Sequence, residues 1–263
     1  MDPMQAILLG LIQGVTEWLP ISSTGHLRLT ELLLDIKVPL LFDVTLHIGT
    51  LVVVILFFRK DVKAILLALA KRDFKSDNGK LILLIIIGTI PSALIGGFLV
   101  DKIEELFITF LPIAVAFISC GIVLYLSKFG QEQKQDLSYL SAIAIGIAQG
   151  IALIPGISRS GLTIATALLL GLKREKAFKF SFLLSVPAVI SALGLTLYEQ
   201  HEALTLIGVG WTEILIGIST SLVISYFALK LLWKTLVGRR FYLFAFYCWL
   251  IGALLLLLSL GDF

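Results

Sequence analysis

The sequence predicts an all-α integral membrane protein built as an inverted-topology repeat, with six transmembrane helices and two re-entrant helical hairpins. Three observations lead to this fold class. Hydrophobic residues make up 58% of the chain and charged residues only 15%, whereas soluble domains average about 45–50% and about 25%. Six long apolar segments are separated by charged loops. Two further segments resemble each other and are interrupted at their centres by proline, glycine, serine and threonine.

Six segments are mostly apolar over about the 20 residues that a helix needs to cross a bilayer. These predicted spans are 40–58, 81–100, 107–127, 180–198, 211–229 and 241–260. Lysine and arginine gather in some of the loops between and around the spans, and acidic residues gather in others. The basic loops are 59–80, 128–138, 173–179 and 230–240, and the acidic loops are 101–105 and 199–202. Because loops rich in lysine and arginine stay in the cytoplasm, both termini are predicted to lie outside.

The remaining segments, 4–38 and 139–172, are predicted to be the re-entrant hairpins. Each half of a hairpin has roughly 15 residues, which is short for a full span at about 1.5 Å per residue. The charges of the flanking loops make 4–38 enter from outside and 139–172 enter from the cytoplasm. The chain then divides into a first repeat, 1–136, and a second repeat, 137–263, each with one hairpin and three spans. Such inverted repeats are the plan of many secondary transporters.

The two hairpin centres align when the sequence is shifted by 136 residues. The aligned pairs are Gly10 and Gly146, Gln13 and Gln149, Gly14 and Gly150, Ser22 and Ser158, Thr24 and Ser160, and Gly25 and Gly161. The charged positions differ, because Glu17 aligns with Leu153 and Ser23 aligns with Arg159. A repeat with diverged charges suggests two half-sites that meet at one ligand near the membrane midplane.

The second hairpin centre, 155–163, has the composition of an anion site. The residues around Arg159 that we predict to bind substrate are Gly156, Ser158, Ser160, Gly161 and Thr163. Free backbone N–H groups at a helix start bind anions, and the arginine fork suits phosphate. The alternative is a structural ion pair between Arg159 and Glu17. That alternative does not explain the hydroxyl groups around the pair.

The first hairpin centre, 13–26, offers acid–base chemistry. Glu17 lies within apolar sequence, where an ionisable side chain indicates a functional site. Ser23 and His26 are three residues apart and would share one face of a helix. We therefore predict Ser23 as a nucleophile and His26 as its base, with a phosphate ligand or a helix N-cap as the alternative roles of Ser23. Ser22 and Thr24 are predicted to bind substrate.

A divalent cation is a further hypothesis for the first hairpin. Gln13 and Glu17 are four residues apart and lie on one helical face, and Mg²⁺ commonly takes one or two carboxylates together with phosphate oxygens. Gln13 and Glu17 are therefore the predicted metal ligands, and Gln13 also counts as a substrate-binding candidate. Asp43 and His47 are spaced i, i+4 within the predicted span 40–58. We expect them to form a buried polar cluster that pins helices together, with a catalytic role as the alternative.

At these residues the sequence resembles the undecaprenyl pyrophosphate phosphatase family, also known for bacitracin resistance. The first family motif matches from Gln13 to His26 and the second from Pro155 to Thr163, and the similarity covers nearly the whole chain. The resemblance implies a plasma-membrane enzyme that removes the terminal phosphate from a C55 polyprenyl diphosphate, so that the monophosphate returns to the cell-wall precursor cycle. It also implies a divalent cation, Mg²⁺ or Ca²⁺, and a site that faces outside. Gln13 stands where many members have glutamate, so Glu17 would carry most of any metal binding.

The expected partners are a polyprenyl diphosphate lipid and the surrounding membrane lipids. The net charge of +3 is small, and no basic stripe with interleaved aromatic residues is present, so no nucleic acid partner is expected. The sequence leaves the oligomeric state open, and a homodimer is one of the states considered. A second function class is a transporter or flippase for a lipid phosphate. Such a carrier needs an anion site but no nucleophile and base.

Overall fold

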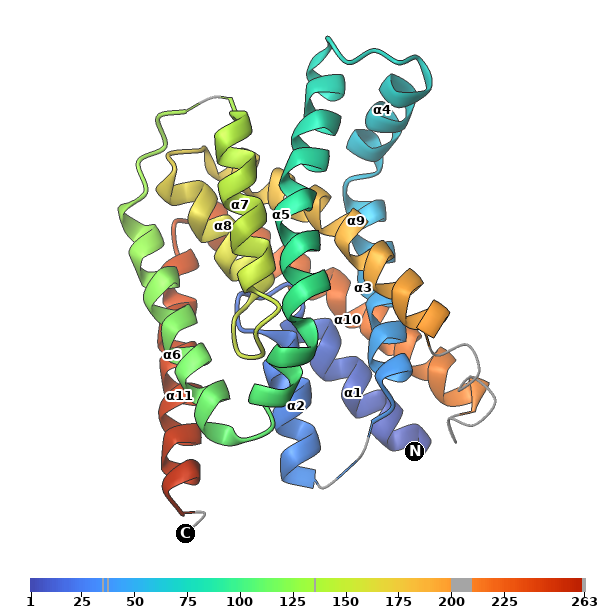
Figure 1. Ribbon diagram of the computed structural model, residues 1–263, viewed down its shortest axis with the longest axis vertical. Coiled ribbons are helices and arrows are strands. Elements are labelled where there is room, and N and C mark those ends of the chain that lie inside the picture. Colours follow the sequence, from blue (N-terminus) through green and yellow to red (C-terminus); the bar gives the residue numbers. More distant parts are fainter. Residues whose placement is uncertain (35, 37, 135, 200–209, 262–263) are drawn as a thin grey trace.

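The computed structural model describes residues 1–34, 36, 38–134, 136–199 and 210–261, and these residues are almost entirely helical (Figure 1). The one extended contact within these ranges is an isolated parallel bridge between Lys134 and Leu172. The predicted all-α class is confirmed.

Five helices of the described chain are long and apolar enough to cross a membrane, counting the 3₁₀ turns η1 (Ser127–Phe129) and η3 (Phe241–Leu243) that extend two of them. They are α5 (Asp77–Leu106), α6 (Phe110–Leu126), α9 (Arg174–Glu199), α10 (Trp211–Val237) and α11 (Phe244–Gly261). Helix α3 (Leu40–Phe57) counts as a sixth span only together with α4 (Arg59–Ala70), which follows an 83° bend. The protein is a multi-pass membrane protein. Its helices α5, α9 and α10 extend beyond the apolar spans predicted at 81–100, 180–198 and 211–229.

Helix α4 corrects the prediction that 59–80 is a loop. The basic residues suggested a loop, but the apolar residues among them are spaced for one face of a helix. Val62 and Ile65 pack against the hydrophobic core, while Lys60 and Lys63 are exposed. This amphipathic pattern is typical of a helix at a protein surface.

The two interrupted segments each form a pair of short helices. The first pair is α1 (Pro3–Thr16) and α2 (Ser23–Leu34), and the second is α7 (Tyr139–Ile151) and α8 (Arg159–Leu169). Figure 1 shows that the pairs open toward opposite ends of the molecule and that their turns lie near its middle. The turns touch, because the backbone N–H of Gly156 donates a hydrogen bond to Ser22 Oγ at 3.1 Å. The re-entrant insertion of the pairs and the inverted repeats 1–136 and 137–263 stay predictions.

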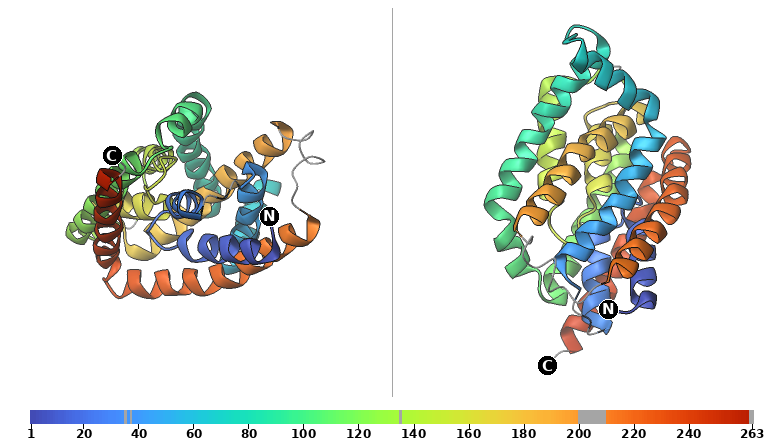
Figure 2. Two further views of the ribbon diagram at one scale, coloured as in Figure 1. Left: turned by 90° about the horizontal axis from the view of Figure 1, so that it is seen from below. Right: turned by 90° about the vertical axis from the view of Figure 1, so that its right-hand side faces the viewer.

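Close helix crossings hold each pair against the bundle. Helix α1 packs against α10, and α7 packs against α5; the left view of Figure 2 shows α1 and α10 side by side. A Cβ atom at Gly10 would come within 2.6 Å of the carbonyl oxygen of Gly217, and one at Gly146 would overlap the backbone of Gly88. Small residues at helix crossings are typical of membrane proteins. The aligned residues Gly10 and Gly146 therefore have the same packing role.

A cluster of aromatic rings lies behind the first turn. The Trp18 ring is 5.1 Å from the Phe182 ring between centroids, and Phe178 is 4.5 Å from Phe182. Trp18 and Phe182 are each only 1% exposed. Since the residue before Trp18 is Glu17, this packing holds the backbone that carries the Glu17 carboxylate.

The start of α1 and the end of α11 lie at one end of the molecule, and α4 lies at the other (Figure 1). The end that carries α4 also carries the predicted basic loop 59–80. The acidic residues at 101–105, which were predicted as a loop, lie instead in the last turns of α5, at the same end of the molecule as the start of α1. The predicted acidic loop 199–202 lies outside the described residues, except for the backbone of residue 199. Which end faces the cytoplasm stays a prediction.

Candidate active site

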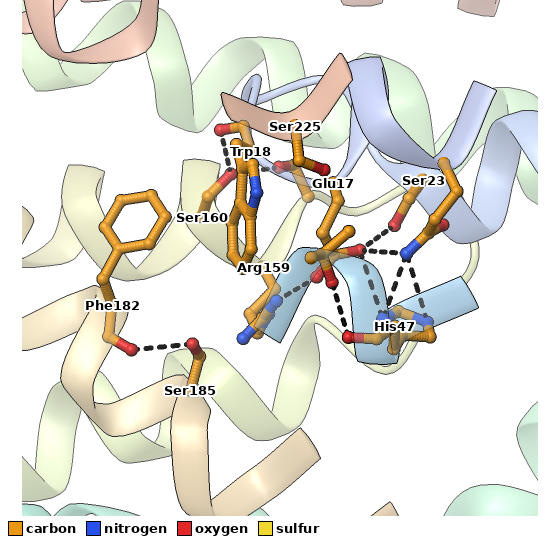
Figure 3. A network of polar contacts seen from close by, with 12 residues as sticks. Glu17, Trp18, Ser23, His47, Arg159, Ser160, Phe182, Ser185 and Ser225 are labelled. Carbon is orange, nitrogen blue, oxygen red and sulfur yellow. Dashed lines mark hydrogen bonds and ion pairs between the residues drawn. The ribbon is translucent and has the colours of Figure 1, made fainter. Parts of the chain in front are cut away.

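Glu17 stands at the centre of a polar network between the two turns (Figure 3). It follows the last residue of α1, and its side chain is only 4% exposed. Its Oε2 atom accepts hydrogen bonds from Ser23 Oγ at 2.6 Å and from Gln13 Nε2 at 3.0 Å. Its Oε1 atom accepts a hydrogen bond from the Arg159 guanidinium. A buried carboxylate with this many partners keeps its charge compensated inside an apolar bundle.

Ser23 is the first residue of α2, and Ser22 before it has a positive φ of 69°. Ser22 Oγ accepts the backbone N–H of Gly25 at 3.2 Å, in addition to that of Gly156 in the second turn. Ser22 therefore connects the two turns, while Ser23 is left free to direct its hydroxyl group at Glu17.

Arg159 is the first residue of α8, whose N-cap Ser158 accepts the backbone N–H of Gly161 at 3.1 Å. The guanidinium lies over the ring of Trp18, with its central carbon 5.5 Å from the ring centroid. One nitrogen, Nη2, binds Glu17, and the other, Nη1, is buried and has no hydrogen-bond partner in the described chain. Arg159 therefore has an unused donor beside the network, as a phosphate site requires.

His47 joins the same network from α3. Its Nδ1 atom lies 3.0 Å from Gln13 Nε2 and 3.6 Å from Glu17 Oε2. From their i, i+4 spacing, Asp43 and His47 were predicted to form a polar cluster together. The structure separates them, because His47 faces Glu17 whereas Asp43 lies beside Glu31 of α2. The i, i+4 spacing in an apolar span was the signal for a functional residue, but it did not show which neighbour His47 meets.

His26 is not part of this network. Its Nδ1 atom lies 2.7 Å from the carbonyl oxygen of Ser22, and its Nε2 atom lies 2.7 Å from the hydroxyl oxygen of Tyr247 in α11. The predicted contact between Ser23 and His26 is therefore absent from this structure. Residues three apart on a helix still differ by about 60° in direction, and here that difference places the two side chains against different neighbours.

A pocket of about 380 Å³ opens beside the network. Its polar side consists of Glu17, Ser23, Thr24, His47, Ser92, Gln149, Ser158, Arg159 and Ser191. The rest is mostly apolar and small, with Gly96, Gly97 and Val100 from α5 and Ala188, Val189 and Ala192 from α9 among its residues. The pocket thus offers charge and hydroxyl groups on one side and a lipid-like surface on the other.

The other predicted substrate-binding residues lie behind the pocket rather than on its wall. Gln13 is fully buried under Glu17 and His47. Ser160 Oγ donates to the carbonyl oxygen of Trp18 at 3.0 Å, and Thr163 Oγ1 donates to that of Arg159 at 2.8 Å. Ser22, Gly156 and Gly161 take part in the turns through the hydrogen bonds described above. These residues build the site, and direct contact of any of them with substrate stays a prediction.

The predicted metal ligands do not form a metal site as they stand. Gln13 directs its amide nitrogen, and not its oxygen, at Glu17 and His47. Both oxygens of Glu17 already accept hydrogen bonds, and one of them binds a guanidinium. Among the described residues, no three histidine, cysteine, aspartate or glutamate side chains lie close enough together to hold a metal ion. This donor set does not fit a resident divalent cation, so no step of the chemistry below runs through one.

Comparisons with known proteins place the chain in a family. The family model described as "Bacitracin resistance protein BacA" matches residues 6–254. A protein of Carboxydothermus hydrogenoformans is 41% identical over 265 residues, which cover 98% of each chain. One from Methanosphaera stadtmanae is 41% identical over 276 residues, covering 98% of this chain and 99% of its own. One from Methanobrevibacter smithii is 38% identical over 277 residues, covering 99% of both. Each relative is named undecaprenyl-diphosphatase. The family suggested by the two sequence motifs is thereby confirmed, and this chain belongs to the BacA family.

Proposed function

We propose that this protein is an undecaprenyl-diphosphatase, a membrane enzyme that hydrolyses the terminal phosphate of a C55 polyprenyl diphosphate. The names of the relatives support this activity. The observation that carries it for this chain is the placement of Glu17, Ser23 and Arg159 on one wall of a largely apolar pocket. Binding of a diphosphate requires a positively charged side chain, and its hydrolysis requires an activated nucleophile. The isoprenoid tail requires an apolar surface.

Arg159 is the residue that would bind the diphosphate. Arg159 lines the pocket, and its buried Nη1 atom is a donor that the contact with Glu17 does not use. Ser158, Thr24 and the backbone at the start of α8 lie on the same wall. Donors that are already in place stabilise the charge that develops on the transferred phosphoryl group.

Ser23 is the nucleophile of the proposed reaction, and Glu17 is its base. Ser23 Oγ already donates its hydrogen to Glu17 Oε2 at 2.6 Å. As Oγ forms a bond to the terminal phosphorus, its proton passes to Glu17, and the bond to the bridging oxygen breaks to release the lipid monophosphate. A water molecule then hydrolyses the phosphoserine and releases phosphate. A water in place of Ser23 is the alternative nucleophile.

Glu17 takes the role that the sequence suggested for His26. The reason is distance: Glu17 Oε2 is in hydrogen-bond contact with Ser23, whereas both ring nitrogens of His26 are bound to Ser22 and Tyr247. His26 then acts as a positioning residue that holds the start of α2 against α11. His47 and Gln13 hold the Glu17 carboxylate in place from the other side.

The isoprenoid tail would leave the site between α5 and α9. Both helices place small residues on the pocket, and a Cβ atom at Gly97 would meet no atom within 4 Å. A Gly97→Leu variant would narrow this exit. We expect it to raise KM for the C55 diphosphate severalfold while leaving a short, water-soluble isoprenoid diphosphate unaffected. Equal effects on both substrates would contradict this tail path.

The plasma membrane and the outward orientation are parts of the same proposal. Their support is the gathering of lysine and arginine in loops that are predicted to be cytoplasmic. A single added cysteine tests the orientation, because the native Cys120 and Cys248 are buried. In intact cells, a cysteine at position 75 should resist an impermeant thiol reagent and one at position 105 should react. The opposite pattern would reverse the orientation. A homodimer stays a prediction.

A divalent cation, Mg²⁺ or Ca²⁺, also stays a prediction. Since the side chains do not form a site of their own, such an ion would arrive with the diphosphate oxygens. Phosphate release should then stop in excess EDTA and return with added Mg²⁺ or Ca²⁺. Full activity in EDTA would show that the reaction needs no free divalent ion.

The second candidate function is a carrier for a lipid phosphate. Two helical pairs reach the middle of the molecule from opposite ends, and their turns touch there. This arrangement favours a carrier, because many transporters bind their substrate between two such broken helices. Purified protein in detergent separates the two functions, because no second compartment exists there. We expect inorganic phosphate release from a long-chain polyprenyl diphosphate, its loss in Glu17→Gln, and its retention in the exposed control Glu105→Gln. No release in detergent, together with lipid movement in vesicles, would favour the carrier.

A further inference from the structure

A second pocket lies at the end of α6, away from the proposed active site. It has a volume of about 380 Å³ and shares no lining residue with the first pocket. Its walls come from η1 and the loop after it, from the start of α9, and from η3. The backbone N–H of Lys134 donates to the carbonyl oxygen of Gly171 at 2.8 Å, which ties this loop to the turn before α9. A backbone hydrogen bond therefore joins two of the segments that form the pocket.

Three cations and one carboxylate line this pocket: Lys128, Arg174, Arg239 and Glu132. Glu132 lies between the two arginines, with its Oε1 atom 2.9 Å from Arg174 Nε and 3.4 Å from Arg239 Nη2. The Arg174 side chain is only 12% exposed, so its ion pair with Glu132 is largely buried. One carboxylate therefore faces three positive charges at this pocket, which leaves a net positive charge.

Lys128 makes no ion pair within the part of the chain that the structure describes. Its ammonium group lies 5.1 Å from the ring centroid of Tyr242 and 5.8 Å from that of Tyr125. These aromatic rings hold the cation at the pocket wall without neutralising it. The site therefore presents a net positive charge.

The surface next to the pocket is apolar. Helices α6 and α11 pack side by side, and they and the adjoining turns η1 and η3 expose large side chains. These are Ile122, Leu126, Phe129, Leu243, Phe246 and Leu250, each between 44% and 64% exposed. In a membrane-spanning bundle, such a face contacts acyl chains. Lysine and arginine at the end of a span lie at the level of the lipid headgroups.

We propose that this pocket binds the phosphate headgroup of an anionic phospholipid, with the acyl chains lying along α6 and α11. The charge of the pocket selects an anion, and the apolar face beside it selects a lipid over a soluble phosphate. Basic pockets between membrane helices are a known way to bind anionic headgroups. The site is separate from the proposed phosphatase reaction and does not depend on it.

The test compares bound lipids in purified, delipidated protein. The protein is mixed with equal amounts of phosphatidylglycerol and phosphatidylcholine of the same acyl chains, and the retained lipid is counted by native mass spectrometry. The wild type should prefer phosphatidylglycerol. The double variant Lys128→Gln, Arg239→Gln should weaken that preference about tenfold or more, since each basic residue near an anionic surface contributes substantially to lipid binding. Both side chains are exposed, so the variant should fold.

A matched control removes the same charge at another place. The double variant Lys71→Gln, Lys75→Gln loses two exposed cations outside the pocket and should keep the wild-type preference. Equal losses in the two double variants, or no preference in the wild type, would overturn the proposal. A further arm adds millimolar inorganic phosphate as a competitor. Displacement of all phosphatidylglycerol by phosphate would show that the occupant is a soluble anion and would overturn the lipid assignment.

Discussion

The turn between α1 and α2 and the turn between α7 and α8 share one hydrogen bond at the start of their second helices. In the first turn, Ser22 Oγ accepts the backbone N–H of Gly25 at 3.2 Å. In the second turn, Ser158 Oγ accepts that of Gly161 at 3.1 Å. These residues occupy aligned positions of the internal repeat. The shared serine thus makes the same capping hydrogen bond in both halves, although the backbone differs: φ is 69° at Ser22 and −77° at Ser158.

The chemistry comes from the positions at which the two turns differ. Ser23 and Arg159 are aligned, each is the first residue of its helix, and both line the pocket. Glu17 and Leu153 are also aligned and also line it. One turn supplies an acid and a hydroxyl group, and the other supplies a cation and an apolar side chain. Two similar turns can therefore build one site that neither could form alone.

The largest effect should come from replacing Arg159, the positively charged residue that only the second turn carries. Arg159→Lys should lower kcat/KM about a thousandfold or more, nearly as much as Arg159→Ala, because lysine cannot bind Glu17 and a phosphate through two nitrogens of one planar group. Phosphate release measured against substrate concentration checks this. The exposed residue Arg72 provides a control, and Arg72→Lys should behave as wild type. Recovery of most of the activity by lysine would reduce Arg159 to a distant counter-charge.

The nucleophile and base that only the first turn carries should act as a unit. Ser23→Ala and Glu17→Gln should each lower kcat at least about a hundredfold, and the double variant should be little worse than either, since members of one catalytic unit are not additive. Single-turnover assays of the three variants give the comparison. Ser23→Ala within about tenfold of wild type would rule out covalent catalysis at this residue.

His26 supplies an internal control for this pair. If His26 only positions α2, the loss of kcat in His26→Ala should add to the loss in Ser23→Ala. The double variant Ser23→Ala, His26→Ala should then have a lower kcat than either single variant. Non-additive behaviour of Ser23 and His26 would return the role of base to His26.

Loss of either shared capping serine should lower the stability of the fold. Loss of a capping hydroxyl group costs about 1 kcal/mol, so Ser158→Ala should lower the midpoint of thermal unfolding in detergent by about 2–4 °C. Ser22→Ala should lower it further, because Ser22 also accepts the N–H of Gly156. Equal shifts would mean that the contact between the turns contributes little to the fold.

The smallest effect should come from Tyr247→Phe. This change removes the hydroxyl group that contacts His26 Nε2 and keeps the ring that stacks on it. One hydrogen bond contributes about 1 kcal/mol, so kcat should fall by no more than about fivefold. A loss as large as that of Ser23→Ala would indicate that the orientation of His26 controls the reaction directly.

The amino-acid sequence by itself determined the membrane class and the main residues of the site. Composition alone excludes a soluble domain, and the apolar segments predicted α5, α6, α9, α10 and α11. Glu17, Ser23 and Arg159 stood out because charged and hydroxyl groups are costly in apolar sequence unless something binds them. These signals depend on residue type and on neighbours along the chain, which a sequence contains in full.

The tertiary structure decided which of these groups meet. Spacing along one helix gives a direction around its own axis, but it does not say which other helix arrives there. His47 reaches Glu17 only because α3 packs beside the first turn, and His26 meets Tyr247 only because α11 passes on the other side of α2. Helix α4 was not predicted for a related reason. Its charged residues suggested a loop, and only the folded structure shows that Val62 and Ile65 pack against the hydrophobic core. The chain thus specified the chemical groups locally, and the packing of distant helices determined their partners.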